Sequence, residues 1–137
     1  MADYRELVRA AFAAREKAYA PYSGFQVGAA LLTKDGAVYG GCNIENASYG
    51  ATNCAERTAF FRAVFDGKKD FSAIAVVGGK TGGGYVESWP CGICRQVMAE
   101  FCNMDTFEVI IAVSEEDYHV YTLKEILPHA FLPSNLI

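Results

Sequence analysis

Apolar side chains recur along the chain with two different periods, and each change of period marks the boundary of a predicted element. Over residues 3–19 they recur at helical spacing on one face, which predicts an amphipathic helix. Asp3, with Glu6 further along, is typical of a capping box at the start of a helix. Pro21 is expected to end the helix, because proline disfavours helical geometry in the residue before it.

Two strands are predicted next, at residues 25–33 and 37–43. Lys34-Asp35-Gly36 lies between them, and Asp-Gly between apolar runs is typical of a β-hairpin. Residues 43–50 are polar and end in glycine, so we expect a loop that leaves the end of the second strand.

The rest of the chain alternates predicted helices with apolar strands. Helices are expected at 54–65 and 91–101, strands at 71–77, 108–113 and 118–121, and a helical turn at 123–127. The continuous apolar run at 71–77 is typical of a central strand covered on both faces, while the glycine-rich residues 78–88 predict a mobile loop. This order predicts a three-layer α/β/α sandwich with a mixed, roughly five-stranded sheet.

Composition narrows the class of protein. A chain of 137 residues that is 52% hydrophobic is expected to form a single domain, 1–137, around one core. The net charge is −4 and the basic residues are scattered, so we expect no nucleic-acid partner. No apolar run is long enough to span a bilayer and no signal segment opens the chain, so we expect no membrane association and a cytoplasmic location.

Cysteine usage points to metal chemistry. The chain has five cysteines, an odd number, which favours metal or thiol chemistry in a reducing compartment over a disulfide framework. Cys91 and Cys94 are three apart at a predicted helix start, so their side chains share one face. Cys54 opens another predicted helix. Three thiolates beside two positively polarised helix N-termini predict a zinc site.

Two charged residues next to Cys54 extend this prediction. Glu56 is expected to carry protons beside the metal, and Arg57 to donate a hydrogen bond to a thiolate and so reduce its charge. A zinc ion with three protein ligands keeps an open position and is catalytic, whereas one with four ligands is structural. The C-x-E motif upstream of P-C-x-x-C is the zinc-deaminase signature in its three-cysteine form.

Two other interpretations of the cysteines remain open at this point. Cys42 ends a predicted strand, and as a fourth ligand it would close the site into a non-catalytic, zinc-stabilised binding domain. Cys102 lies two helical turns beyond Cys94 and cannot reach the same ion. Alternatively, Cys91 and Cys94 form the redox pair of a thiol oxidoreductase, which leaves the neighbouring Cys54 and Glu56 unexplained.

Nearly the whole chain resembles the cytidine deaminase family, in its small form with three cysteine ligands. The resemblance rests on residues 21–30 (PYSGFQVGAA), 43–47 (NIENA), 54–57 (CAER) and 90–96 (PCGICRQ). It implies zinc-dependent hydrolytic deamination of free cytidine and 2′-deoxycytidine to the uridine forms plus ammonia, in pyrimidine salvage. It further implies one Zn²⁺ per chain, bound by Cys54, Cys91 and Cys94, with Glu56 as the catalytic proton carrier.

The resemblance also implies how a nucleoside is bound. Asn43 and Glu45 would hold the ribose 3′-hydroxyl, and Phe25 would stack on the pyrimidine. The backbone N–H of Ala55 would meet the base carbonyl, and the backbone carbonyl of Trp89 would accept from the leaving amine. Many relatives carry Ser or Thr at the position of Trp89, whose bulk puts the shape of the pocket in question. Read without the family, Phe25 is equally a core residue, and Asn43 and Glu45 are ordinary loop residues.

The family is typically homotetrameric, and Ala47, Tyr49 and Phe131 match positions that reach into a neighbouring subunit's site. Tyr49 and Phe131 have an alternative role, packing within their own subunit.

A deaminase of another aminopyrimidine compound, such as a blasticidin-type drug, would share both zinc motifs. The Asn43 and Glu45 pair favours the nucleoside over that alternative.

Overall fold

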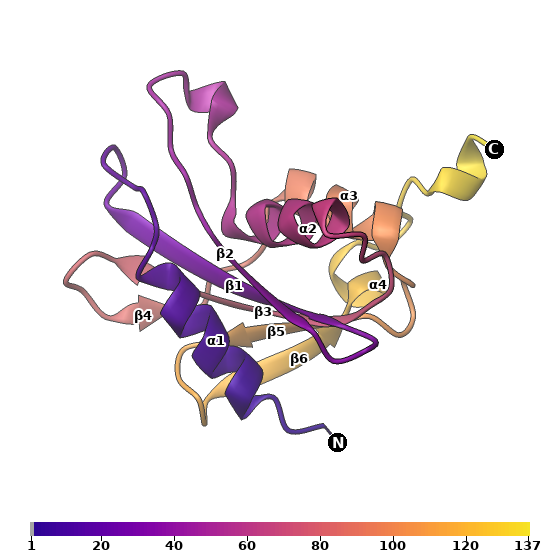
Figure 1. The fold of residues 1–137 in the computed structure, drawn as a ribbon, viewed down its shortest axis with the longest axis horizontal. Coiled ribbons are helices and arrows are strands. Elements are labelled where there is room, and N and C mark those ends of the chain that lie inside the picture. Colours follow the sequence, from indigo (N-terminus) through magenta and orange to yellow (C-terminus); the bar gives the residue numbers. More distant parts are fainter. Residues whose placement is uncertain (1) are drawn as a thin grey trace.

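A mixed six-stranded sheet forms the middle of the molecule in the computed structural model, which describes residues 2–137 (Figure 1). The strands run in the order β2-β1-β3-β5-β6, and β4 pairs with β3 beside this path. They are β1 Phe25–Thr33, β2 Val38–Cys42, β3 Phe71–Lys80, β4 Tyr85–Val86, β5 Glu108–Ala112 and β6 Tyr118–Thr122. Only β3 and β5 pair in parallel, and the other pairs are antiparallel, which confirms the predicted mixed sheet and its hairpin at one edge.

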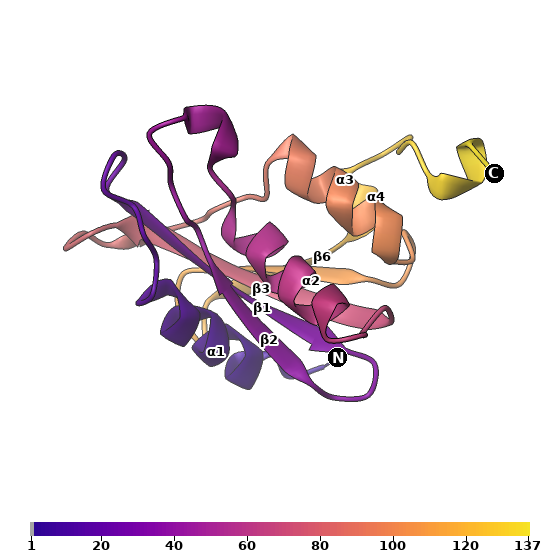
Figure 2. The ribbon, with the colours of Figure 1, turned by 45° about the horizontal axis from the view of Figure 1, so that its top comes forward.

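Helices cover both faces of this sheet, which makes three layers (Figures 1 and 2). One face carries α1 (Arg5–Arg15), and the other carries α2 (Ala55–Phe65), α3 (Gly92–Phe101) and the short α4 (Leu123–Ile126). Single 3₁₀ turns occupy Tyr49–Ala51 and Pro133–Asn135. Among residues 2–137, no helix has the length and apolar character needed to cross a membrane.

Alternation along the strands divides the buried side chains between two cores. Ile74 and Val76 of β3 point toward α2 and α3, where they pack in one cluster with Phe60 and Met98. Ala75 and Val77 of the same strand point toward α1. Because successive strand residues face opposite sides and both sides are covered, β3 reads as a continuous apolar run. The prediction of a central strand at 71–77 is confirmed.

Two glycines set how closely the helices approach the sheet. A Cβ on Gly28 of β1 would lie 2.1 Å from the carbonyl oxygen of Ala11 in α1. A Cβ on Gly41 of β2 would lie 2.4 Å from the carbonyl oxygen of Ala55, at the start of α2. Real side chains do not tolerate such distances, so each glycine lets one helix rest directly on strand backbone.

The helix predicted at 3–19 is wrong at both ends. It ends at Arg15 instead of Tyr19, because the backbone N–H of Tyr19 donates to the carbonyl of Asn43 and the segment pairs with the chain after β2. The predicted capping box is also absent, since the Asp3 carboxylate binds the backbone and guanidinium of Arg5. A long-range backbone pairing thus overrides a local helical pattern.

The loop predicted at 78–88 is wrong over part of its length. Gly78–Lys80 extend β3, and Tyr85 and Val86 form β4, which pairs with Gly78 and Gly79. A Cβ on Gly79 would lie 2.5 Å from the carbonyl oxygen of Gly84, so the absence of side chains lets the two strands approach. Glycine here permits close backbone contact, as well as the turn at Gly82, where φ is +74°.

Candidate active site

Cys54 and Cys91 occupy equivalent places at the starts of two helices. Each is the N-cap residue of its helix, Cys54 before α2 and Cys91 before α3, with extended backbone dihedral angles. The backbone N–H groups of the first helical turn have no partner within the helix, and the helix dipole adds positive potential there. Both cysteine side chains therefore start from a point of positive potential.

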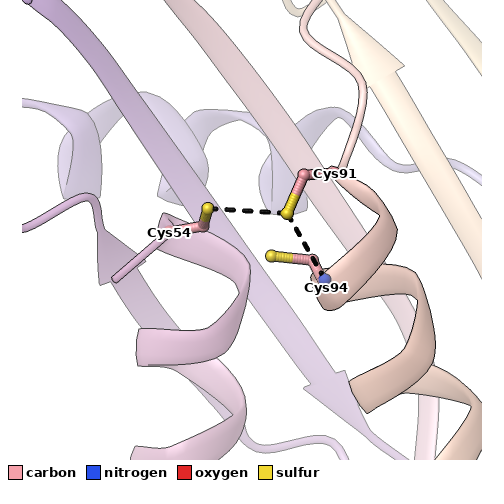
Figure 3. Close-up of side chains that lie close together, drawn as sticks. All are labelled: Cys54, Cys91 and Cys94. Atoms are coloured by element: carbon pink, nitrogen blue, oxygen red, sulfur yellow. Dashed lines mark hydrogen bonds between the residues drawn. The ribbon is translucent and has the colours of Figure 1, made fainter. Parts of the chain in front are cut away.

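The three cysteines predicted as ligands lie together. The sulfurs of Cys54, Cys91 and Cys94 are all within 4.8 Å of one another and point toward a common centre (Figure 3). The Sγ atoms of Cys54 and Cys91 are 3.8 Å apart. Two sulfurs at about 2.3 Å from a tetrahedral zinc ion are separated by about 3.8 Å. This donor set fits zinc in both chemistry and spacing.

Charge compensation for three thiolates is present as well. Arg57 donates from Nη2 to the Cys54 sulfur at 3.3 Å, as predicted, and the Cys94 backbone N–H donates to the Cys91 sulfur at 3.5 Å. Among the described residues, the buried Nε of Arg57 has no hydrogen-bond partner. A partly buried guanidinium held against a cysteine sulfur is stable when that sulfur carries negative charge, as a metal-bound thiolate does.

The thiols of Cys54 and Cys94 and the carboxyl group of Glu56 have strongly shifted pKa values. A hydrogen bond from Cys94, together with Arg57, lowers the pKa of the Cys54 thiol to about 5, and the same bond raises the pKa of Cys94. Burial raises the pKa of Glu56 to about 7, since its side chain is only 4% exposed. A carboxyl group with a pKa near neutrality can both accept and donate a proton at physiological pH.

A cavity of about 350 Å³ opens beside the cysteines and Glu56. Among its lining residues are Phe25, Asn43, Ala55 and Trp89, so the structure gathers these predicted contacts around one space. Phe25 therefore lines the cavity and is not simply a core residue. Glu56 and Cys54 reach it from the start of α2, and Cys91 from the start of α3.

The predicted ribose pair is split between two adjoining spaces. Asn43 lines the cavity, but its side chain also bridges β1, accepting from the Val27 N–H and donating to the Phe25 carbonyl. Glu45 lines a smaller neighbouring cavity, where its carboxylate accepts from the backbone N–H groups of Tyr22 and Ser23. Thr52 lines both cavities and so connects them.

Sequence reasoning missed Ser88, which is buried and lines the cavity beside Trp89. A Cβ on Gly78 would lie 2.3 Å from the Ser88 hydroxyl oxygen and 3.1 Å from the Phe25 ring. An interior strand glycine marks close approach by another group, and Gly78 was the available signal. Trp89 is 43% exposed and packs on Tyr121 with ring centroids 4.9 Å apart.

The remaining candidates lie outside the cavity. Cys42, weighed as a fourth ligand, donates to the Lys17 carbonyl at 3.4 Å and lines a separate cavity between α1, β2 and α2. The metal-ligand cluster found in residues 2–137 contains Cys54, Cys91 and Cys94 without it. Ala47, Tyr49 and Phe131 are exposed on the surface of the chain.

Comparison with known proteins gives a consistent result. Residues 1–111 match the family model described as the cytidine and deoxycytidylate deaminase zinc-binding region. Cytidine deaminases of Halalkalibacterium halodurans and Sporosarcina psychrophila are 52% and 50% identical over 134 residues, which is 98% of this chain and 98% and 95% of theirs.

Solved structures agree with the sequence relatives. The cytidine deaminase of Burkholderia pseudomallei aligns with a TM-score of 0.83 at 53% identity, covering 96% of this chain and all (100%) of that one. The cytidine deaminase of Mycobacterium tuberculosis aligns with a TM-score of 0.80 at 37% identity, covering 96% of this chain and 98% of that one.

Proposed function

The chain belongs to the cytidine and deoxycytidylate deaminase family, and from this premise we propose that it deaminates free cytidine and 2′-deoxycytidine hydrolytically. The products are uridine or 2′-deoxyuridine and ammonia, and the role is pyrimidine salvage. The observation that carries the proposal is the convergence of a three-thiol cluster and a buried Glu56 on one cavity that is also lined by Phe25 and Asn43.

Cys54, Cys91 and Cys94 would hold one Zn²⁺ per chain, which supplies Lewis-acid activation of a water molecule when bound. Glu56 takes one proton from the attacking water and delivers it to N3 of the pyrimidine. It then takes the remaining proton of the hydroxyl group now on C4 and delivers it to the amino group, which leaves as ammonia. Its burial supports this role, because a pKa near 7 keeps both protonation states accessible. Arg57 holds a hydrogen bond on the Cys54 sulfur throughout.

The other cavity residues would orient the substrate. Phe25 offers an aromatic face to the pyrimidine ring. The Ala55 N–H is in the first turn of α2, where backbone N–H groups have no partner within the helix, and would donate to the base carbonyl. The Trp89 carbonyl would accept from the leaving amine. It precedes Pro90, whose own carbonyl accepts from Arg95 at 2.7 Å. Asn43 and Glu45 bind the ribose 3′-hydroxyl.

This arrangement disfavours the alternatives. A structural zinc domain needs a fourth protein ligand, and Cys42 lies in a different cavity. A thiol oxidoreductase needs only Cys91 and Cys94, yet the Cys54 sulfur lies equally within their cluster. The Asn43 and Glu45 pair, which suits a ribose, favours a nucleoside over a blasticidin-type drug as substrate.

We also propose a homotetramer, in which Ala47, Tyr49 and Phe131 reach a neighbouring subunit's site, and a cytoplasmic location. The exposure of Tyr49 and Phe131 supports the first, and five free thiols support the second. One sheet accounts for the described strands, which supports a single domain over residues 1–137.

The deciding experiment is cytidine turnover by purified protein, followed by ultraviolet absorbance, with zinc quantified in the same sample. We expect turnover with about one zinc per chain, and near-complete loss of turnover with zinc retained in Glu56→Ala. Zinc without turnover of cytidine or deoxycytidine would contradict the proposal. Substantial activity in Glu56→Ala would assign the proton transfer to another group.

A further inference from the structure

Arg15, in the last turn of α1, is a buried cation on the face of the sheet opposite to the candidate active site. It is 5% exposed. Its guanidinium donates to three backbone carbonyls, those of Gln26 at 3.0 Å, Gly79 at 2.7 Å and Lys80 at 3.4 Å. Gln26 and Gly79 are direct partners across β1 and β3, so the Arg15 side chain is hydrogen-bonded to both strands at the same end.

The same guanidinium also contacts β4, through the ring of Tyr85. Its Cζ atom lies 4.9 Å from the ring centroid of Tyr85, and Phe12 of α1 packs edge-on against the same ring at 4.7 Å. The carboxylate nearest to Arg15 is that of exposed Glu16, 3.7 Å away. Burial removes water from the Arg15 guanidinium, and the three carbonyl dipoles and the face of the Tyr85 ring offset most of that cost. The offset is lost if β1, β3 or Tyr85 moves away.

The segments that Arg15 holds continue directly into the cavity. Gln26 follows Phe25, the proposed base-stacking residue, and the β3–β4 hairpin leads to Ser88 and Trp89. Gly78 packs against both Ser88 and the Phe25 ring on the cavity side of the sheet. If the start of β1 and the β3–β4 hairpin moved, Phe25 and the segment from Ser88 to Trp89 would move with them. Cys54 and Glu56 belong to the start of α2 and take no part in these contacts.

We propose that Arg15 is a positioning residue for substrate binding, which acts from the far face of the sheet by fixing Phe25 and the segment from Ser88 to Trp89. The proposal deepens the deaminase function and rests on it for its kinetic part. Lysine cannot replace this residue fully, because an ammonium group lacks the planar fork that reaches several carbonyls and stacks on a ring.

The test compares Arg15→Met and Arg15→Lys with Arg9→Met in the zinc-loaded, full-length protein. Arg9 is a matched control, since it lies on the same helix but pairs with Glu115 at the exposed surface. We expect KM for cytidine to rise on the order of tenfold in Arg15→Met, and less in Arg15→Lys, from misplacement of binding groups. kcat and zinc content should stay near those of the wild type, and Arg9→Met should change neither kinetic constant.

A second readout does not depend on turnover. Trp89 is the single tryptophan of the chain, so acrylamide quenching of its fluorescence without substrate reports the packing of its segment. We expect stronger quenching in Arg15→Met but not in Arg9→Met. Tyr85→Leu should change quenching and KM in the same direction, while Tyr85→Phe, which keeps the ring, should not. Because Tyr85 is 44% exposed, these variants test the proposal even if Arg15→Met fails to fold.

The outcomes separate the two proposals. If the wild type does not turn over cytidine, the deaminase function fails, and Trp89 quenching alone decides whether Arg15 positions the cavity wall. If the Arg15 and Tyr85 variants lose stability but keep wild-type KM and quenching, Arg15 is only a stabilising residue and the proposal is overturned. Loss of zinc in Arg15→Met would overturn it as well, by placing the effect at the metal site.

Discussion

Cys54 and Glu56 stand two residues apart at one helix start, yet their environments shift their pKa values in opposite directions. Hydrogen bonds to the Cys54 sulfur favour its charged form, so its pKa falls to about 5. Glu56 is buried, which disfavours its charged form, so its pKa rises to about 7. The first shift suits a metal ligand, which binds as the thiolate. The second suits a proton carrier, because a pKa near 7 keeps both protonation states accessible.

The Glu56 shift predicts a pH-dependent effect on stability. A folded-state pKa of about 7, above the ordinary 4.5, means that the stability contributed by Glu56 is complete below pH 4.5 and is lost as the pH rises through 7. In metal-free, reduced protein, Glu56→Gln should therefore unfold in urea with a free energy higher than that of the wild type by roughly 2–3 kcal/mol at pH 8. The difference should be small at pH 5. Exposed Glu100→Gln is the control, and a gap for Glu56→Gln that does not grow with pH would contradict the buried carboxyl.

Arg57 is predicted to tune the electrophilicity of the metal centre. Its removal takes a cation away from the Cys54 sulfur, which leaves more negative charge on the three thiolates. Arg57→Ala should retain zinc, raise the pH at which activity appears, and lower activity at pH 7 by roughly 10–100-fold. The measurement is the pH profile of kcat/KM with zinc content. Arg62→Ala, on the same helix but bonded to the Gly40 carbonyl, should leave the profile unchanged. A wild-type profile in Arg57→Ala would refute the role.

At the scale of elements, Gly28 and Gly41 allow α1 and α2 to pack closely on the β1–β2 hairpin, from opposite faces of the sheet. Each touches helix backbone where a Cβ would stand, Gly28 under α1 and Gly41 under α2. Only α2 carries a ligand and the proton carrier. The two glycines therefore make the same kind of packing contact, but only the contact of Gly41 positions residues of the candidate active site.

This difference predicts a separation between stability and metal affinity. Gly41→Ala and Gly28→Ala should each lower the free energy of unfolding by about 1–3 kcal/mol or more, since overpacking forces backbone to move. Gly41→Ala alone should also weaken zinc binding, roughly 10–100-fold, because it displaces the start of α2. Urea unfolding and competition with a zinc-binding dye measure the two effects. Equal zinc affinity in both variants would show that the contact with Gly41 does not position the start of α2.

At the scale of the whole molecule, α2, α3 and the C-terminal tail leave large apolar side chains uncovered. Phe61 is 49% exposed, Phe65 95% and Ile93 62%, and the helices that carry them lie on the same face of the sheet (Figures 1 and 2). Apolar groups gathered on one face favour association with another chain. Ile93 adjoins Cys94 at the start of α3, and Phe65 ends α2 far from Cys54, so this face extends from the cysteine cluster to the other end of the helices. We expect it to form contacts in the proposed homotetramer.

Light scattering after size-exclusion chromatography tests the assembly. We expect a mass of about four times that of one chain for the wild type, from the proposed homotetramer. Phe61→Glu should shift it toward smaller species, because burying an unpaired carboxylate in an apolar interface is unfavourable. Val38→Glu, which adds the same charge at a half-exposed position on the edge strand β2, should keep the wild-type mass. A wild type that elutes as a monomer would exclude the tetramer.

The sequence by itself determined the types of the elements and the identity of the cysteine cluster. The apolar period of a strand or helix is fixed by backbone geometry, so residues 25–33, 54–65, 71–77 and 91–101 could be assigned locally. The spacing of Cys91 and Cys94 likewise places both sulfurs on one face of a helix start. Cys54 and Glu56 were assigned to the same site because C-x-E upstream of P-C-x-x-C is the three-cysteine zinc-deaminase signature; a helix start alone would not have distinguished them.

Only the tertiary structure decided what depends on partners distant in the chain. The end of α1 is set by the pairing of Tyr19 with the chain after β2, and β3 is lengthened by its pairing with β4. The separation of Cys42 from the cluster and the burial of Ser88 against Gly78 have the same origin. Hydrogen bonds and packing between remote segments override local propensity, and a single sequence does not reveal which segments will meet.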